Sequence, residues 1–562
     1  MFLPTTKEEL KKLGWSKLDI ILITGDAYID SPYVGVSVIG KTLLKAGYKV
    51  GIIAQPDVNS AEDISRLGEP KLFWGVSAGC IESMVSNYTA TKKRRKKDDF
   101  TPGGENVKRP DRSVIAYSNL IRKFFKNTKP IVLGGIEASL RRIPHYDYWD
   151  NKIRRSILFD SKADLLVYGM GEKTVLELAD KLQKGDSVEN IRGLCYISKT
   201  AKEGYIILPP YEEVKTDKNT FIDMFNIFYN NNDPITANGL CQKQDTRYLI
   251  QNPSQYNLNS EEFSNICNLP YERDVHPYYK KDGAVRALET IRFSVNTHRG
   301  CYGQCNFCSI SVHQGTTVIS RTVESILTEI EEITKLQDFK GYISDLGGPT
   351  ANMYAIECEK KLKNGQCREK KCLHPKICEN LKISHKKQLE LLSKIRNIPK
   401  IKKVFIASGI RYDMLMNDKE CMNDYMKDLV LYHISGQLKI APEHTEDKVL
   451  KIMGKTSQSY LCDFKDIFDR LNKQYGKEQF LTYYLIAAHP GCEINDMNNM
   501  KKFIIEKLKL IPEQIQIFTP SPSTYSTLMY YTETDPFTKE KIFVEKDLGK
   551  KELQKRVIRR AS

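Results

Sequence analysis

Short apolar runs that alternate with amphipathic stretches constrain the fold of this chain more than any other feature. In the first half of the sequence a helical stretch near Val38–Ala46 lies between two such runs. Buried strands are predicted at Leu18–Thr24, Tyr48–Gln55, Leu72–Ser77, Pro130–Leu133 and Asp164–Tyr168. Strands of this kind with helices between them favour a parallel sheet covered on both faces. We therefore expect residues 1–216 to form a doubly wound α/β domain, which binds ligands beyond the carboxyl ends of its strands.

The same alternation returns in the second half of the chain. Strands are predicted at Thr290–Asn296, Gly341–Asp345, Lys403–Ser408, Gln437–Ile440, Phe480–Ala487 and Gln514–Phe518. Six strand–helix steps indicate a partial (β/α)6 barrel over residues 287–535, with function at the C-terminal ends of its strands. Residues 217–286, rich in Asn, Tyr and Pro, are predicted to be a partly irregular connector. Residues 536–562 are predicted to be a basic tail, either helical or disordered.

Composition limits the compartment and the class of chemistry. No apolar run reaches 18 residues, so we expect no membrane-spanning helix. The first residues lack the apolar core of a secretory signal, which favours the cytoplasm. Fourteen Cys in a reducing compartment favour metal or redox chemistry over a disulfide framework.

The charge balance is basic, with 86 Lys and Arg against 70 Asp and Glu and a net charge of +16. Such a surface can attract polyanions, including nucleic acid, or can simply keep a Lys-rich protein soluble. The densest run is Lys92–Lys97, six basic residues without interleaved aromatic residues. This pattern is more typical of a solvated loop than of a base-stacking surface.

Three cysteines carry the clearest chemical signal. Cys301, Cys305 and Cys308 have the spacing C-x3-C-x2-C directly after the first predicted barrel strand. A tight loop with this spacing can wrap three thiolates around a cubane iron–sulfur cluster. Three protein ligands leave one iron open, as a catalytic metal centre requires. A zinc half-site built on Cys305 and Cys308 is the alternative, but it leaves the third Cys unexplained.

The motif CYGQCNFC resembles the cluster loop of the radical S-adenosylmethionine (SAM) superfamily, which has an aromatic residue before its third Cys, here Phe307. The resemblance implies that Cys301, Cys305 and Cys308 hold a [4Fe–4S] cluster and are the catalytic residues. It also implies that the open iron chelates SAM. Reductive cleavage of SAM then gives methionine and a 5′-deoxyadenosyl radical.

The ends of the later barrel strands carry further residues that the resemblance assigns to the cofactor. Asp345-Leu346-Gly347-Gly348-Pro349-Thr350 stands where the superfamily has a glycine-rich motif whose backbone carbonyls receive the SAM amino group. Weaker matches end the third and fourth strands. The expected cofactor-binding residues are Phe307, Gly347, Gly348, Pro349, Ser408, Arg411 and Glu443.

The resemblance extends to the YgiQ-type radical SAM proteins, a group without an assigned substrate, and covers nearly the whole chain. It is carried by Val132–Arg142, His145–Trp149, Tyr168–Glu172, Asp345–Tyr354 and Gln516–Tyr531. The N-terminal domain is similar to the cobalamin-binding-like domains that precede many radical SAM barrels. The usual Asp-x-His-x-x-Gly signature for the lower axial ligand is missing, so cobalamin is a doubtful cofactor.

A second Cys group follows the glycine motif within a predicted insert at residues 351–385. Cys358, Cys367, Cys372 and Cys378 are spaced by eight, four and five residues, among mostly basic neighbours that stabilise thiolates. Four thiolates fill a zinc site or a second iron–sulfur cluster. His374 could replace one of them, and unliganded thiols are the alternative.

The sequence thus predicts a radical SAM enzyme that needs an external low-potential electron donor and acts on an unassigned substrate. The positive charge favours RNA or a phosphorylated metabolite. Two functions of other classes stay open at this point. One is a zinc-dependent nucleic-acid-binding protein that uses both Cys groups structurally. The other is a non-catalytic iron–sulfur redox protein, which the open coordination site disfavours.

Overall fold

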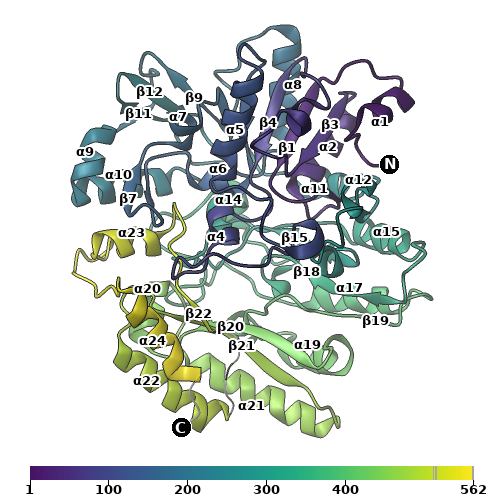
Figure 1. Ribbon diagram of the computed structural model, residues 1–562. Coiled ribbons are helices and arrows are strands. Elements are labelled where there is room, and N and C mark those ends of the chain that lie inside the picture. The colour runs from purple at the N-terminus through teal and green to yellow at the C-terminus, as the bar shows by residue number, and fades with distance from the viewer. Residues whose placement is uncertain (510–511, 513–514, 560–562) are drawn as a thin grey trace. The chain divides into compact units, whose positions relative to one another are not determined.

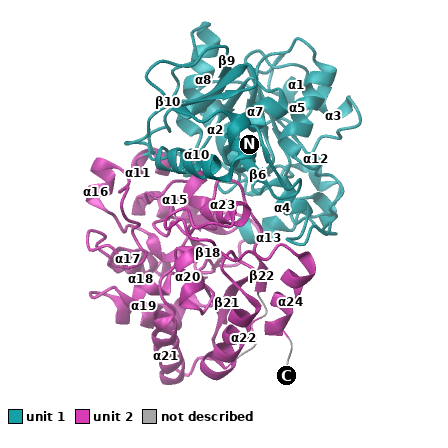
Figure 2. Cartoon of the chain, turned by 90° about the vertical axis from the view of Figure 1, so that its left-hand side faces the viewer, with its two compact units in different colours: residues 1–258, 265–292 teal, residues 259–264, 293–562 magenta. Residues whose placement is uncertain are grey.

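Two units make up the part of the chain that the structure describes, residues 1–509, 512 and 515–559 of this computed structural model (Figure 1). The first unit contains residues 1–258 and 265–292, and the second contains residues 259–264 and 293–562 (Figure 2). The predicted boundary between connector and barrel, at residue 287, lies close to this division. Each unit has its own apolar core.

The first unit is built on a nine-stranded sheet. Its order is β10-β11-β12-β9-β8-β5-β4-β1-β3. The parallel strands are β1 (Ile20–Thr24), β3 (Val50–Ala54), β4 (Phe73–Ser77), β5 (Ile131–Leu133) and β8 (Leu165–Val167). All five residues of β1 and of β3 are buried, as expected for strands covered on both faces. The five predicted strands and the doubly wound α/β class are confirmed.

Helices between these strands cover the sheet. Helix α2 (Gly35–Lys45) packs on β1 and β3 and against α8 (Glu172–Lys184). Helix α5 (Ser113–Phe124) packs on β4 and against α7 (Ile157–Ser161). In chain order the first five parallel strands lie 2-1-3-4-5, so the order reverses between β1 and β4. That reversal is the ligand crevice of a doubly wound sheet.

Residues 217–286 differ from the predicted connector. They contain α10 (Lys218–Asn230) and the antiparallel strands β11 (Leu240–Gln244) and β12 (Arg247–Gln251). These strands join the main sheet, where β12 pairs with β9 (Leu194–Ser198) and β11 with β10 (Ile206–Leu208). The pattern was missed because Gln, Lys and Arg alternate with the apolar residues, and tertiary pairing decides such a segment.

The second unit contains the predicted barrel strands in parallel register. Strand β14 (Ser294–Asn296) pairs with β18 (Asp345–Gly347), and β17 (Tyr342–Ile343) pairs with β19 (Lys403–Val404). A parallel bridge joins Ile410 to Ile440 in β20 (Gln437–Glu443). From there β20 pairs with β21 (Phe480–Ala487) and β21 with β22 (Ile515–Ile517). Gln514, the first residue of the last predicted strand, lies outside the described residues.

Amphipathic helices follow these strands, as in a β/α barrel. They are α15 (Val323–Ile333), α17 (Lys386–Arg396), α19 (Met422–Asp428), α21 (Ser459–Gln474) and α22 (Ile494–Phe503). Their apolar faces and the strands enclose one core that includes Val295, Ile343, Leu438 and Leu485. The carboxyl ends of the parallel strands meet at one edge, which carries the site described below.

Part of the predicted basic tail forms a packed helix. Helix α24 (Leu548–Arg559) contacts α22, β21 and β22. Its side chains Lys551, Gln554 and Ile558 are buried, and Gln554 Oε1 accepts the N–H of Ala488 at 2.9 Å. Residues 560–562 lie outside the described part. Across the described residues, no helix is both long and apolar enough to span a membrane, as expected.

Candidate active site in the second unit

The cysteine loop leaves the barrel through a pair of short strands. Strand β15 (His298–Arg299) pairs antiparallel with β16 (Ile319–Ser320), so residues 300–318 form a loop closed at its base. Gly300 has φ +80°, and a Cβ there would lie 2.0 Å from the C=O oxygen of Thr317. Only glycine fits this turn into the loop. Tyr302 is fully buried, and its hydroxyl donates to the C=O of Ile356 at 3.2 Å.

The three thiols of the loop converge. A Cβ built on Gly303 would lie 3.3 Å from Cys301 Sγ and 3.6 Å from Cys305 Sγ. Burial, together with the neighbouring charges of Cys305 and Cys301, raises the pKa of Cys308 to about 12. Burial also raises the pKa of Cys301. The three cysteines of the predicted triad therefore lie within one loop and are partly exposed.

Arg411, predicted to bind the cofactor, lies over this loop. Its Nη1 donates to Cys305 Sγ at 3.5 Å, and its other nitrogens hold Asp413 in a two-point ion pair at 2.8 and 2.5 Å. Burial by itself raises the pKa of Asp413, but Arg411, Lys455 and the Thr456 hydroxyl bring it down to about 2. A guanidinium fixed in this way presents positive charge to thiolates.

The glycine motif continues β18 next to the loop. The Thr350 hydroxyl lies 3.5 Å from Cys301 Sγ. The C=O of Gly347 accepts the N–H of Thr297 at 2.7 Å and its hydroxyl at 3.1 Å. Among the described residues, no hydrogen bond reaches the C=O of Gly348 or Pro349. These two carbonyls, rather than that of Gly347, are the ones available to a ligand amino group.

Ser408 has a different environment from the one predicted. Its hydroxyl and its N–H both donate to the carboxylate of Asp345, the latter at 3.0 Å. The same carboxylate accepts the N–H of Ala407 at 2.8 Å. Asp345 therefore ties the end of the third strand to β18. In this arrangement Ser408 holds the glycine motif in place and does not present a free hydroxyl donor.

Glu443 ends β20 in a strained conformation. Its φ of +70° is left-handed, which is uncommon for a residue other than glycine and is concentrated at functional sites. Burial raises the pKa of its carboxyl to about 7, while Lys455 and Arg411 act in the lowering direction. The charge of Glu443 also acts on Cys308. This carboxyl therefore lies within electrostatic reach of the cysteine loop.

Phe307 has an apolar role in the structure. It packs against the barrel core, and its ring meets the His489 ring edge-on, with centroids 6.2 Å apart. His489 is held in turn by the Ser526 hydroxyl at 2.7 Å. The aromatic residue before the third Cys thus anchors the loop to the fifth strand end.

Three residues that sequence reasoning did not assign complete the site. His298 is buried, and its Nε2 lies 3.0 Å from the C=O of Thr350. Burial lowers the pKa of His298 to about 4, so the ring is neutral. Asp413 orients Arg411. Lys371 donates to the C=O of Gln304 at 2.9 Å. Only His298 had a sequence signal, its place between the first strand and the cysteine motif.

The four cysteines of the insert also come together. Cys358 and Cys372 belong to a small apolar cluster with Tyr302 of the cysteine loop. The charges of Cys358, Cys378 and Cys367 all act on the Cys372 thiol. His374, considered as a substitute ligand, instead lies with its Nδ1 2.9 Å from the C=O of Lys455.

Among the described residues, no three His, Cys, Asp or Glu side chains stand close enough to share one metal ion. A single zinc ion needs its sulfurs within about 2.3 Å of one point. A cubane cluster lies between its ligands and holds their sulfurs apart by its own width, so it requires convergence of the thiols rather than contact. The cysteine loop meets that requirement, and its donor set fits an iron–sulfur cluster.

In the first unit, the crevice between β1 and β4 is filled by the chain itself. The Arg109 guanidinium donates to Asp26 Oδ1 and the C=O of Ala78, both at 2.7 Å, and to Asp98 Oδ2 at 3.0 Å. Gln55 Nε2 donates to the C=O of Gly25 at 2.9 Å and to the Thr101 hydroxyl oxygen at 2.7 Å. These contacts occupy the place where a doubly wound sheet receives a nucleotide-like ligand.

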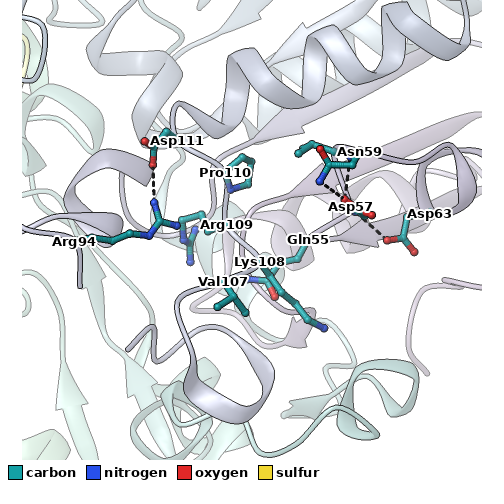
Figure 3. A pocket seen from close by; sticks show the side chains of 11 residues that line it. Gln55, Asp57, Asn59, Asp63, Arg94, Val107, Lys108, Arg109, Pro110 and Asp111 are labelled. Carbon is teal, nitrogen blue, oxygen red and sulfur yellow. Dashed lines mark hydrogen bonds and ion pairs between the residues drawn. The ribbon is translucent and has the colours of Figure 1, made fainter. Parts of the chain in front are cut away.

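A cavity of about 530 Å³ borders this crevice, with Gln55 and Arg109 in its lining (Figure 3). Part of its polar lining is engaged, since Arg94 lies 3.6 Å from Asp111, and an Asp63 carboxylate oxygen accepts the backbone N–H of Asp57 at 2.9 Å. Side chains of the basic run Lys92–Lys97 also form contacts within the first unit. Lys97 pairs with Glu105 at 2.5 Å, and Arg95 donates to the C=O of Tyr88 at 3.1 Å. Two of the six basic side chains of this run, Arg95 and Lys97, are therefore engaged within their own unit.

Comparison with known proteins identifies the family of this chain. A family model described as Radical SAM N-terminal matches residues 2–294. A UPF0313 protein from Fusobacterium nucleatum subsp. nucleatum is 60% identical over 99% of this chain and 98% of its own length. A UPF0313 protein from Thermotoga petrophila is 49% identical over 98% of this chain and 96% of its own length.

Two solved structures share the fold. The radical SAM methyltransferase TsrM from Kitasatospora setae, with cobalamin and a [4Fe–4S] cluster bound, has a TM-score of 0.54 at 12% identity. That match covers 91% of this chain and 74% of TsrM. The cobalamin-dependent radical enzyme OxsB has a TM-score of 0.51 at 13% identity, over 94% of this chain and 57% of OxsB. With the family model and the UPF0313 relatives, this evidence shows that the chain belongs to the radical SAM family and is an enzyme of that class.

Proposed function

We propose that Cys301, Cys305 and Cys308 hold a [4Fe–4S] cluster and that this enzyme cleaves SAM reductively. The observation that carries the proposal is the convergence of three thiols on one loop, beside the glycine motif and under Arg411. When bound, the cluster supplies one electron that breaks a carbon–sulfur bond of SAM, giving methionine and a 5′-deoxyadenosyl radical that takes a hydrogen atom from substrate. The electron comes from an external low-potential donor.

The chain's own residues have separable roles. The carbonyls of Gly348 and Pro349 would accept the SAM amino group, and the Glu443 carboxyl would contact the same cofactor. Arg411 sets positive charge against Cys305. Ser408 and Phe307 act indirectly, by holding the glycine motif and the cysteine loop. Because the Cys301 and Cys308 pKa values are raised, cluster assembly must release protons from these thiols.

We propose further that the enzyme works without cobalamin. TsrM and OxsB carry cobalamin, but the crevice at the β1/β4 reversal of this chain holds Arg109, Asp26 and Asp98 instead. An ion-paired side chain with no exposed surface is costly to displace, because its removal leaves buried carboxylates without a partner. The residues present do not fit the group, so no step is assigned to it.

The substrate proposal rests on charge. A net charge of +16 supports a polyanionic substrate, RNA or a phosphorylated metabolite. The Lys92–Lys97 run contributes little to that argument, because Lys97 and Arg95 are engaged within their own unit. A cytoplasmic setting is supported by the cysteines, all fourteen of which are free thiols in the structure.

Electron paramagnetic resonance of the reduced, anaerobically reconstituted enzyme tests the cluster assignment. We expect a cluster signal that shifts when SAM is added, since SAM would bind the open iron. Cys305→Ala should abolish the shift. Cys462→Ala, which removes a partly exposed thiol of α21, should keep it. A SAM-dependent shift that survives in Cys305→Ala would contradict the proposal.

A further inference from the structure

A lysine from the insert that follows the glycine motif holds the residues on either side of Cys305. Lys371 Nζ donates to the C=O of Gln304 at 2.9 Å and to Asn306 Oδ1 at 2.5 Å. Gln304 and Asn306 are the chain neighbours of Cys305. One ammonium group therefore bridges the backbone across the middle cysteine of the loop.

Asn306, one of the two acceptors, is itself fixed to the barrel. Its backbone N–H and its Nδ2 donate to backbone carbonyls of α20 (Asp447–Met453), at 2.8 and 2.7 Å. Its C=O accepts a backbone N–H from α23 (Tyr525–Thr532) at 2.9 Å. The side-chain oxygen that receives Lys371 is therefore part of a rigid junction, and the lysine ties the cysteine loop to that junction.

Other groups of the second unit surround the ammonium of Lys371. The ring centroids of Tyr525 and Phe537 each lie 5.9 Å from Nζ. A Cβ on Gly454, directly after α20, would lie 3.1 Å from Nζ and 3.4 Å from the Asn306 side chain. Glycine at this helix end therefore leaves room for the ammonium, which is held in one place between the cysteine loop and the end of the chain.

The positive charge of Lys371 has no carboxylate beside it. Among the residues that the structure describes, its hydrogen bonds go to a carbonyl and an amide oxygen, and none goes to Asp or Glu. Arg411, the other cation at this loop, is paired with Asp413. A cation that leaves water without a counter-charge is costly. The thiolates of the loop, with the cluster they would hold, are the negative charge within reach of Lys371, and the charge of Cys305 acts on it.

We propose that Lys371 is a positioning residue for the [4Fe–4S] cluster of the cysteine loop, because it clamps the backbone around Cys305 and places an uncompensated positive charge beside it. This inference rests on the proposed function of the loop. Net charge and hydrogen bonding around the sulfurs set the reduction potential of such clusters. The reduced state carries one more negative charge than the oxidised state, so a cation nearby favours the reduced state.

A redox titration of the reconstituted full chain, followed by electron paramagnetic resonance without SAM, tests the role of the charge. Lys371→Met keeps an unbranched stem and removes the charge, so we expect a more negative reduction potential than in the wild type. Lys371→Arg keeps the charge and should stay close to the wild type. Lys376→Met, at an exposed position of the same insert, is the matched control and should leave the potential unchanged, because solvent screens its charge. A Lys371→Met enzyme with the wild-type potential would overturn the proposal.

Hydrogen–deuterium exchange of the cluster-free full chain tests the clamp independently of iron, and it decides the matter if Lys371→Met binds less iron than the wild type. The backbone N–H groups of Asn306 and Cys308 are hydrogen-bonded, at 2.8 and 3.0 Å. We expect Lys371→Met to speed their exchange about tenfold, because a charged hydrogen-bond donor no longer holds the loop. Lys376→Met should exchange like the wild type.

Unchanged exchange in Lys371→Met would overturn the clamp. If the wild type assembles no cluster while Lys371→Met still exchanges faster, the proposed function fails and the clamp on Cys305 remains.

Discussion

At the scale of single residues, the site depends on side chains that are fixed by a second partner. Arg411 donates to Cys305 with one nitrogen while Asp413 holds its other nitrogens, and Ser408 is tied to the glycine motif because its hydroxyl donates to Asp345. The sequence motif identified the cysteines, because their spacing along the chain can be read without knowledge of the fold. It could not identify Asp413 or Lys371, which become relevant only through contacts across the fold.

Glu443 should contribute directly to SAM binding. We expect Glu443→Gln to weaken SAM binding about tenfold, because one charge-assisted hydrogen bond to the cofactor is lost. Glu420→Gln, at an exposed position of the same unit, should bind SAM like the wild type. Isothermal titration of the reconstituted proteins measures both dissociation constants. Equal affinity in wild type and Glu443→Gln would remove Glu443 from the cofactor site.

In the second unit, His385 and Asp418 form a buried pair. This pair makes the stability of the fold depend on pH. The two side chains are 2.6 Å apart, and Asp418 also accepts the N–H of His385 and of Cys421. Burial by itself raises the pKa of Asp418, but these partners bring it down to about 2. Because this folded-state pKa lies below the unfolded value, the stabilisation is present above about pH 4 and is lost as pH falls towards 2.

Asp418→Asn should therefore lower the free energy of unfolding by about 2 kcal/mol at neutral pH and by much less near pH 2. Asp424→Asn, at an exposed position of α19, is the matched control and should have little effect at either pH. Urea unfolding followed by circular dichroism at neutral pH and at the lowest pH where the chain stays folded measures the difference. A loss that is constant across this range would contradict the assignment.

At the scale of elements, the strand–helix alternation was predictable because buried parallel strands are nearly continuous apolar runs. Strands β11 and β12 could not be predicted in this way, since their polar residues mask the apolar pattern of a strand. They become recognisable as strands only through their pairing with β10 and β9. For the basic tail the sequence left a helix and a disordered end open, and it could not predict that helix α24 packs on the barrel. Its buried Lys551 and Gln554 are polar residues that find partners in the barrel.

The turn after β18 should tolerate no side chain at its second glycine. A Cβ on Gly348 would lie 2.7 Å from the His298 ring and from the backbone oxygen of His298, which cannot move away. We expect Gly348→Ala to weaken SAM binding at least tenfold by displacing the motif. Gly409→Ala is the control, because its nearest neighbour would be 4.0 Å away. Near-wild-type SAM affinity in Gly348→Ala would show that the motif does not approach the cofactor.

At the scale of the whole molecule, one chain combines a doubly wound sheet with a radical SAM barrel, as TsrM and OxsB do. Shared architecture does not fix the cofactors, because function resides in sites grafted onto folds. In this chain the crevice of the first unit carries Arg109 and two carboxylates. The sequence pointed away from cobalamin only through the missing Asp-x-His-x-x-Gly motif. The structure adds that the Arg109 side chain occupies the crevice.

The full chain should therefore take up no cobalamin. After incubation with hydroxocobalamin and removal of free ligand, we expect an absorbance spectrum without corrin bands. A known cobalamin-binding radical SAM enzyme, treated alongside, should retain them. Stoichiometric cobalamin on this chain would contradict the account of its first unit.

The most direct measurement of the central claim is the release of 5′-deoxyadenosine. Reconstituted enzyme, SAM and a strong reductant are incubated without oxygen, and the product is measured by mass spectrometry. We expect 5′-deoxyadenosine and methionine from the wild type and from Cys462→Ala, and none from Cys305→Ala. If the wild type, with both cluster and SAM bound, releases no 5′-deoxyadenosine, the three thiols of the loop do not perform the chemistry assigned to them.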